Sequence, residues 1–168
     1  MEHVEYTYTV GMTDEEVTER LRAGTTAVLA LAHDNDAYAL PVSYAYRDGS
    51  LLLRLSDDGH SKKMTYAGTT DEASLLLYDA SDGDSWSVVV EGELRRLPPE
   101  ERQSFDAAAI NDAFTDLRVF DEPIGDVEVV LFELVPNRVT GRRTGEHNET
   151  VRSEDPGSDE GPSDDDTP

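Results

Sequence analysis

The chain has 168 residues, of which 37 are acidic and 14 are lysine or arginine, giving a formal net charge of -23. This length predicts one domain, and the absence of cysteine excludes a disulfide framework and thiolate metal ligands. No apolar run approaches the roughly 20 residues of a membrane helix, and the acidic N-terminus is unlike a signal peptide. We therefore expect a cytoplasmic protein with no membrane partner.

The acidic charge is not confined to the C-terminal end. Residues 142–168 carry nine acidic and three basic residues, which leaves 28 acidic and 11 basic residues, a net charge of -17, in residues 1–141. Such charge opposes compaction at ordinary ionic strength, whereas at molar salt the screening length falls to about 3 Å. This balance is typical of a halophile's protein, and an acidic protein with an interaction tail is the alternative.

Nucleic acid is not expected as a partner, because an acidic surface repels phosphate.

A short helix is predicted to follow Thr13. Thr13 and Glu16 have the spacing of a capping box, in which the hydroxyl accepts from the N3 amide and the carboxylate reaches back to the cap. Val17 and Leu21 form an apolar stripe, and Gly24 is placed to end the helix.

The next segments have the composition of strands. Residues 25–33 are rich in small and β-branched side chains, and residues 38–47 resume the extended pattern after a polar turn. The second segment ends at Asp48 and Gly49, a pair that favours a type I′ hairpin because both central positions need positive φ. Residues 50–56 then continue as the partner strand.

The middle of the chain predicts one further helical segment and two strands. Residues 61–68 have the pattern of one or two helical turns, and residues 73–80 and 85–97 have the pattern of strands. Gly92 in the second of these strands indicates a bulge or a bend.

The period changes at Pro98 and Pro99, which suit a helix start, and a surface helix is predicted over 98–120. Its apolar positions near helical spacing are Phe105, Ala108, Ala109, Ala113 and Leu117.

Residues 126–143 predict a final strand with two apolar faces. Val127, Val129, Leu131 and Glu133 are expected on one face, and Val130, Phe132 and Leu134 on the other. Beyond Gly145 the only aliphatic residue is Val151, so 146–168 is predicted to be a disordered acidic tail that follows a domain over 1–145.

These segments predict a mainly antiparallel β fold with peripheral helices. Long strands with a tight hairpin and glycine bends are compatible with a small barrel, because closure removes exposed sheet edges. The periodicity leaves the choice between a barrel and a sandwich open.

The order of several segments resembles a known family. LPVSYAY, a DG hairpin, SLLLRLS, a glycine followed by a lysine pair, and SWSVVVEGELR occur in the order and spacing of the FMN-binding split barrels similar to pyridoxamine 5'-phosphate oxidase. FELVPNRVTGRR also resembles the closing strand of that family, so the resemblance covers residues 12–143. It implies a split β-barrel and a homodimer with FMN at the subunit interface.

FMN has a flat apolar ring with polar edges and a dianionic phosphate at the far end, so its site must offer both a wall and cations. The resemblance places the ring against strand backbone, and the phosphate at Gly59, Ser61 and the helix start that Ser61 would cap. The chain has no lysines besides Lys62 and Lys63, and Lys62, nearer this cap, is favoured slightly for the close contact. The candidate cofactor-binding residues are Val42, Ser43, Tyr44, Ser56, His60, Ser61, Lys62, Lys63, Trp86 and Ser87.

Each of these candidates also has an ordinary structural interpretation. The lysines can be solvated surface, the residues on strands can simply alternate between core and solvent, and Trp86 can belong to the core. The histidines lack HxH or HExxH spacing, so no metal site is expected, and GxSxG, GxGxxG and Walker motifs are absent. No residue stands out as a catalytic acid or base.

The sequence therefore predicts an FMN-dependent oxidoreductase acting on a small molecule that the sequence does not identify. An F420-binding split-barrel reductase and a non-enzymatic cofactor-binding or interaction module are the alternatives. A generic reductase role is favoured over true pyridoxamine phosphate oxidase activity, because the only further basic pairs that could hold a substrate phosphate are Arg95–Arg96 and Arg142–Arg143.

Overall fold

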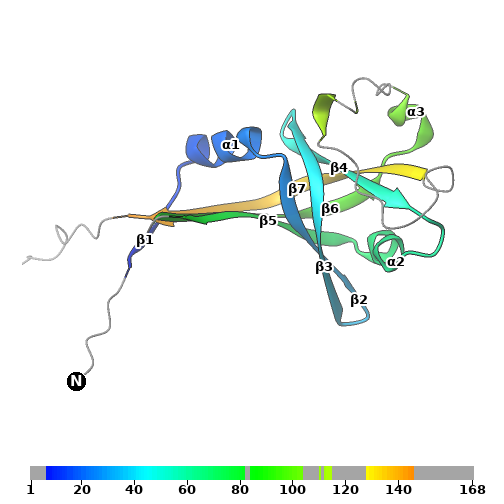
Figure 1. Cartoon of the computed structure of the whole chain (residues 1–168), viewed down its shortest axis with the longest axis horizontal. Helices are drawn as coiled ribbons and strands as arrows, with labels where there is room; N and C mark the ends of the chain where they lie inside the picture. Colours follow the sequence, from blue (N-terminus) through cyan, green and yellow to red (C-terminus); the bar gives the residue numbers. More distant parts are fainter. Residues whose placement is uncertain (1–6, 82–83, 104–109, 111, 115–127, 146–168) are drawn as a thin grey trace, which may run out of the picture.

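The computed structural model describes residues 7–81, 84–103, 110, 112–114 and 128–145. Seven strands and three helices have bounds within these ranges, and Ile110, Asp112 and Ala113 are helical as well (Figure 1). In chain order the strands and helices are β1 (Thr9–Gly11), α1 (Asp14–Ala23), β2 (Thr26–His33), β3 (Asp36–Arg47), β4 (Ser50–Asp57), α2 (Lys62–Thr69), β5 (Glu72–Ser81), β6 (Asp84–Arg96), α3 (Pro99–Arg102) and β7 (Glu128–Thr144).

Six of the strands form a closed antiparallel ring. The order is β7-β4-β3-β2-β5-β6, and β6 pairs again with β7, so that no strand of the ring is left at an edge. The short β1 pairs with the last residues of β7 outside this ring. The mainly antiparallel split-barrel fold that the sequence predicts is confirmed, whereas β1 was not predicted.

Two tight turns set the register of the first three ring strands. Asp48 and Gly49 have φ values of 51° and 86°, which confirms the predicted hairpin between β3 and β4. Asp34 and Asn35, with φ values of 47° and 65°, make the equivalent turn between β2 and β3.

The predicted bulge occurs within the antiparallel pairing of β6 and β7. Glu91 pairs with Arg138 but Gly92 pairs with Pro136, so β7 has one extra residue at this point. A side chain at position 92 would collide with the backbone carbonyl of Val135. Glycine is therefore required here by the close approach of the two backbones.

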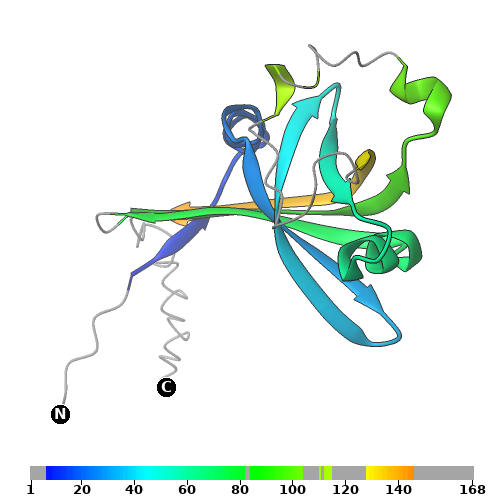
Figure 2. The same ribbon diagram turned by 45° about the vertical axis from the view of Figure 1, so that its right-hand side comes forward.

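The main core fills the ring, and α1 covers one end of it. Val17 and Leu21 of α1 are buried against the core, as their spacing predicts. The capping box is also confirmed: the Glu16 amide donates to Thr13 Oγ1 at 3.2 Å, and the Thr13 amide donates to Glu16 Oε2 at 2.8 Å. Figures 1 and 2 show α1 and α2 at separate positions around the ring.

A second, smaller apolar cluster lies on the other face of β4 and β7. It consists of Leu52, Leu97, Phe114 and Leu131, with Ala113 packed against it. The two-faced pattern of β7 is confirmed, because Val130, Phe132 and Leu134 belong to the main core.

Parts of the predicted organisation lie outside the described residues. For the predicted helix over 98–120, α3 and Ala113 are described, whereas Phe105, Ala108, Ala109 and Leu117 are not. Val127 and the predicted tail over 146–168 also lie outside. None of the described helices has the length and apolar character needed to cross a membrane.

Candidate functional site

The loop between β4 and α2 contains most of the predicted phosphate-binding residues. Gly59 has a φ of 81°, which allows the chain to reverse toward α2. The amide of Gly59 donates to Asp57 Oδ1 at 2.8 Å, and the amide of His60 donates to Asp58 Oδ1 at 2.9 Å. The Gly59 amide, one of the expected phosphate donors, thus already donates to a neighbouring carboxylate.

Ser61 occupies the N-cap position of α2, but its side chain does not cap the helix. Its backbone carbonyl accepts from the amides of Met64 and Thr65 at 3.1 and 3.3 Å. The Ser61 hydroxyl is buried, and within the described part of the chain it has no hydrogen-bond partner. Buried hydroxyls without a partner are uncommon in folded proteins, so this group is available to a ligand that can accept a hydrogen bond.

Lys63 joins α2 to β4. Its ammonium donates to Ser56 Oγ at 2.6 Å, which brings together two predicted site residues that are seven positions apart in the sequence. Together with Ser61, two positions before Lys63, these residues place one cation and two hydroxyl groups at the start of α2. We refer to Ser56, Ser61 and Lys63 as the Lys63 cluster.

Lys62 points in another direction. Its ammonium lies 5.1 Å from the ring centroid of Tyr38 on β3 and 5.0 Å from that of Tyr66 on α2. These distances are within the range of cation–π attraction. The sequence favours Lys62 for the closest phosphate contact, whereas in the structure Lys63 is the lysine that bonds a predicted site hydroxyl, that of Ser56.

Ser43 and Ser56 lie on the outer face of the ring, since the alternate residues on both strands face the core. Arg54 on β4 lies opposite Ser43 and two residues before Ser56, and it is only 6% exposed. Its guanidinium lies 5.3 Å from the ring centroid of Phe114. Sequence reasoning missed Arg54, although an arginine within the apolar run SLLLRLS is a visible signal.

The side chains of Val42 and Tyr44 belong to the core. Tyr44 is fully buried, its hydroxyl donates to the carbonyl of Leu21 at 2.9 Å, and its amide donates to the carbonyl of Thr25. Burial raises the pKa of Tyr44 to about 12. Of the three adjacent candidates on β3, only Ser43 presents its side chain to the outer face.

Trp86 and Ser87 lie at the start of β6, away from the Lys63 cluster along the sheet. They pair with Arg143 and Arg142 near the end of β7, the same part of β7 that pairs with β1. The guanidinium of Arg20 on α1 lies 4.6 Å from the centroid of the Trp86 ring. Within one chain, Trp86 and Ser87 therefore do not lie in the same place as the Lys63 cluster.

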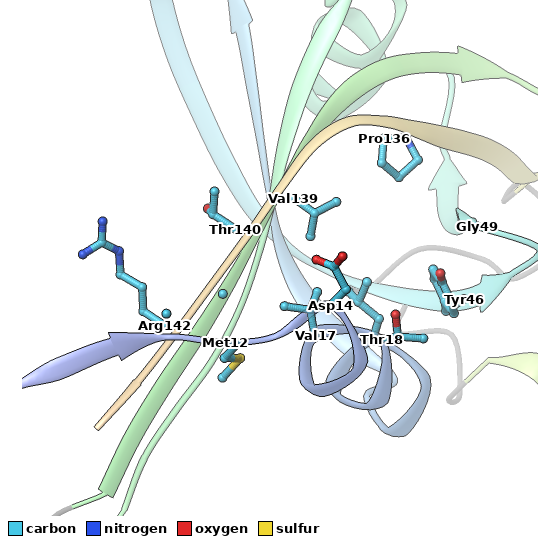
Figure 3. Close-up of a pocket in the computed structure, with 13 residues that line it drawn as sticks. Met12, Asp14, Val17, Thr18, Tyr46, Gly49, Pro136, Val139, Thr140 and Arg142 are labelled. Carbon is cyan, nitrogen blue, oxygen red and sulfur yellow. The ribbon is translucent and has the colours of Figure 1, made fainter. Parts of the chain in front are cut away.

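A cavity of about 570 Å³ lies between α1, the turn after β3 and the second half of β7 (Figure 3). None of the ten predicted cofactor residues lines it. Figure 3 shows the guanidinium of Arg142 pointing away from the other lining side chains. The lining residues are Gly11, Met12, Asp14, Val17, Thr18, Leu21, Tyr46, Gly49, Pro136, Val139, Thr140, Gly141 and Arg142.

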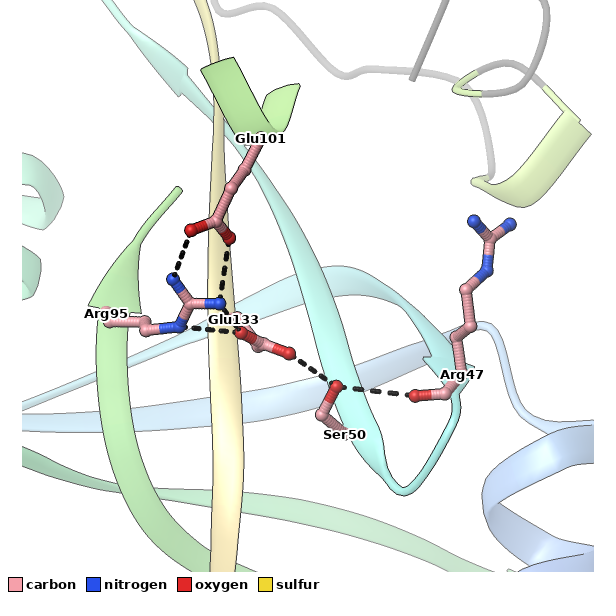
Figure 4. A network of polar contacts seen from close by, with 5 residues as sticks. All are labelled: Arg47, Ser50, Arg95, Glu101 and Glu133. Atoms are coloured by element: carbon pink, nitrogen blue, oxygen red, sulfur yellow. Dashed lines mark hydrogen bonds and ion pairs between the residues drawn. The ribbon is translucent and has the colours of Figure 1, made fainter. Parts of the chain in front are cut away.

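Arg95, one of the arginines considered for a substrate phosphate, is already paired with carboxylates. Its Nε donates to Glu133 at 2.7 Å, and its terminal nitrogens donate to Glu101 at 2.9 and 3.2 Å (Figure 4). Glu133 also accepts from the hydroxyl of Ser50 at 2.7 Å. The hydrogen bonds to Glu101 are the largest cause of a raised pKa of Arg95, and the bond to Glu133 raises this pKa further. The guanidinium is therefore already neutralised by carboxylates of the same chain. Arg143 likewise pairs with Glu16 at 2.9 Å.

Comparison with solved structures shows the same fold in flavin-associated proteins. The FAD-binding protein from Mesorhizobium loti has a TM-score of 0.67 and 22% identity, over 82% of this chain and 99% of that chain. The FAD binding protein from Mycobacterium smegmatis has a TM-score of 0.63 and 17% identity, over 82% and 100%. The FAD and heme binding protein from Mycobacterium smegmatis has a TM-score of 0.58 and 14% identity, over 80% and 72%.

At the level of sequence, no curated protein matches the chain. The family model described as pyridoxamine 5'-phosphate oxidase matches residues 13–143, which include the ring, α1 and the Lys63 cluster. This range agrees with the extent of the resemblance found in the sequence. The chain therefore belongs to the pyridoxamine 5'-phosphate oxidase family.

Proposed function

We propose that the chain binds FMN on the outer face of β3 and β4 and acts as an FMN-dependent oxidoreductase on a small molecule. The observation that carries this proposal is the Lys63 cluster. The ammonium of Lys63 is held by Ser56 at 2.6 Å, two residues after a buried Ser61 hydroxyl that has no partner in the described residues. A phosphate oxygen accepts from both kinds of donor and compensates the positive charge.

The remaining outer-face residues fit the other end of a flavin. Ser43 presents a hydroxyl on the same face as Ser56, and the buried Arg54 lies opposite Ser43 and two residues before Ser56 on β4. A flavin bound here would supply the redox chemistry, whereas the protein would bind, orient and shield it. We assign no acid or base, because no residue of this face stands apart as one.

The structural neighbours support a flavin without choosing its form. Three of them are described as FAD-binding or FAD and heme binding proteins. FAD contains the same ring and the same first phosphate as FMN, so the Lys63 cluster suits either. We propose FMN because the order and spacing of the segments in this chain resemble those of the FMN-binding split barrels.

The separation of the predicted residues within one chain supports a homodimer. Trp86 and Ser87 lie at the start of β6, whereas the Lys63 cluster lies between β4 and α2. Two copies can unite the two groups if β6 of one chain approaches the outer face of the other. The flavin would then lie at the subunit interface.

The experiment is an absorption spectrum of the purified protein with mass analysis of the ligand released on denaturation. We expect flavin bands and the mass of FMN. FAD would keep the flavin site but change its cofactor, and the F420 spectrum would favour the reductase alternative. A colourless protein that takes up none of the three would contradict the proposal and favour a non-enzymatic module.

Substitution of Lys63 locates the phosphate. Lys63→Gln should weaken FMN binding about tenfold or more, since a charge-assisted hydrogen bond contributes about 1.5 to 3 kcal/mol. Riboflavin has the ring but no phosphate, so its affinity should not change. Equal affinity of the variant and the wild type for FMN would place the phosphate elsewhere.

A further inference from the structure

Tyr38 and Tyr66 form an aromatic pair that receives the ammonium of Lys62. Their ring centroids are 5.3 Å apart with an interplanar angle of 56°, and the ammonium of Lys62 lies 5.0 to 5.1 Å from both. The cation therefore interacts with two ring faces at once. We refer to Tyr38 and Tyr66 as the tyrosine pair.

The tyrosine pair is fixed to the β2–β3 hairpin. The hydroxyl of Tyr66 donates to Asp36 Oδ2 at 2.6 Å, and the ring of His33 packs edge-on against Tyr66 at 5.9 Å. At the other end of α2, the amide of Ala32 donates to Thr70 Oγ1 at 3.2 Å. The second half of α2 is thus attached to this hairpin.

The two lysines consequently attach the first turn of α2 to different strands. Adjacent residues on a helix point about 100° apart. Lys62 reaches β3 through Tyr38, while Lys63 reaches β4 through Ser56. A rotation of α2 that brought Lys62 toward Ser56 would break the contacts of both lysines.

We propose that Lys62 is a positioning residue, held by the tyrosine pair, that orients Ser61 and Lys63 toward the cofactor phosphate without contacting it. This role rests on the proposed flavin function. It predicts that removing the tyrosine pair weakens phosphate binding even though both lysines remain. A direct phosphate ligand would behave in the opposite way, because freeing its ammonium from the rings would preserve or strengthen binding.

The first test needs no activity. Lys62 and Lys63 are the only lysines, so protein labelled with 13C-lysine gives two sets of side-chain NMR signals. Ring currents should shift the ε-methylene protons of Lys62 upfield, and Tyr38→Leu should reduce that shift to the part that the Tyr66 ring contributes. Added FMN should move the Lys63 signals and leave those of Lys62 in place. Movement of the Lys62 signals out of the upfield region when FMN binds would overturn the proposal.

The second test is a double-mutant cycle on FMN affinity. Lys62→Gln and Tyr38→Leu should each lower it by roughly threefold to tenfold, and the double variant should lose no more than the larger single effect, because both remove one interaction. Lys62→Arg should restore binding, since a guanidinium also stacks on aromatic rings.

The outcomes separate the two proposals. Riboflavin affinity should be unchanged in every variant, which shows that the ring site remains folded. If Lys62→Gln lowers FMN affinity as much as Lys63→Gln while Tyr38→Leu has no effect, Lys62 is a direct ligand and the positioning role is overturned. If the wild type binds neither FMN nor riboflavin, the flavin function fails and the positioning role fails with it, although the upfield Lys62 signals would still show the contact.

Discussion

At the scale of single residues, Tyr44 illustrates how a polar group is accommodated in the core. Its ring is fully buried, and its hydroxyl finds an acceptor in the carbonyl of Leu21, in the last turns of α1. A side chain at position 24 would collide with this hydroxyl, so Gly24 ends α1 and also leaves room for Tyr44. The tyrosine thereby connects α1 to the inside of the ring.

The raised pKa of Tyr44 predicts a pH dependence of stability at high pH. The folded state holds the proton up to about pH 12, whereas an unfolded tyrosine releases it near pH 10. The free energy of unfolding should therefore be unaffected by this group below about pH 10 and fall by about 1.4 kcal/mol per pH unit between the two values.

Urea unfolding of the wild type and Tyr44→Phe from pH 9 to pH 12 checks this prediction. At pH 9 the wild type should be more stable by about 1 kcal/mol, the net value of its hydrogen bond. The difference should shrink and reverse as the pH rises, because the phenylalanine of the variant cannot ionise. Parallel curves would show that Tyr44 does not resist deprotonation.

At the scale of elements, the antiparallel pairing of β6 with β7 closes the ring. The bulge at Gly92 allows these two long strands to bend together, which Figure 1 shows as the curved path they share. The backbone of Val135 occupies the space that a side chain at position 92 would need. Closure of the ring therefore depends on one position without a side chain.

We predict that Gly92→Ala lowers the free energy of unfolding by about 2 kcal/mol or more, because the backbone carbonyl of Val135 cannot move aside without breaking the β6–β7 ladder. Gly11→Ala is the matched control. It is also a strand glycine paired with β7, but no atom lies near its added methyl group. Its effect should stay within about 0.5 kcal/mol. Equal urea midpoints for the two variants would contradict the requirement for glycine.

At the scale of the whole molecule, negative charge is the dominant feature. The chain carries a formal charge of -23, and its ion pairs, such as Arg143–Glu16 and Arg95–Glu101, are largely exposed. Exposed pairs contribute about 1 kcal/mol or less each. They cannot offset the repulsion among the remaining carboxylates when the surrounding salt is dilute.

We therefore predict that dialysis from molar to low salt lowers the thermal midpoint and dissociates the proposed dimer, because screening is lost. Circular dichroism and light scattering across the salt range measure both effects. Unchanged melting and unchanged mass would contradict a salt adaptation.

The C-terminal segment provides the control for this prediction. Truncation after Gly145 removes nine acidic residues and one basic residue. If residues 146–168 contribute nothing to folding, the truncated chain should melt at the same temperature in high salt and show a weaker salt dependence. A large loss of stability in high salt would show that this segment docks on the domain.

The features that the sequence determined by itself are those set by residues close together in the chain. Thr13 and Glu16 satisfy each other's backbone amides within one helical turn, and Asp48 and Gly49 allow positive φ at two adjacent positions. The bulge at Gly92 was also visible as a glycine within a strand pattern. Local geometry accounts for each of these, so local pattern was sufficient to predict them.

Only the tertiary structure decided which faces and which neighbours these segments have. Period-two alternation gives two equivalent faces, and pairing with β2 and β4 was needed to place Tyr44 inside and Ser43 outside. β1 was missed because three residues carry too short a pattern, and its partner lies more than 130 residues away.

The lysine pair shows the same limit within the candidate site. The sequence shows two adjacent lysines after Ser61, but it does not predict how α2 is rotated about its own axis, and so which strand each lysine faces. That rotation is set by long-range contacts, with Tyr66 bonded to Asp36 and Lys63 to Ser56. Sequence reasoning therefore proposed the candidate site, and only tertiary contacts gave its two lysines different neighbours, because the direction of a helical side chain depends on what the helix packs against.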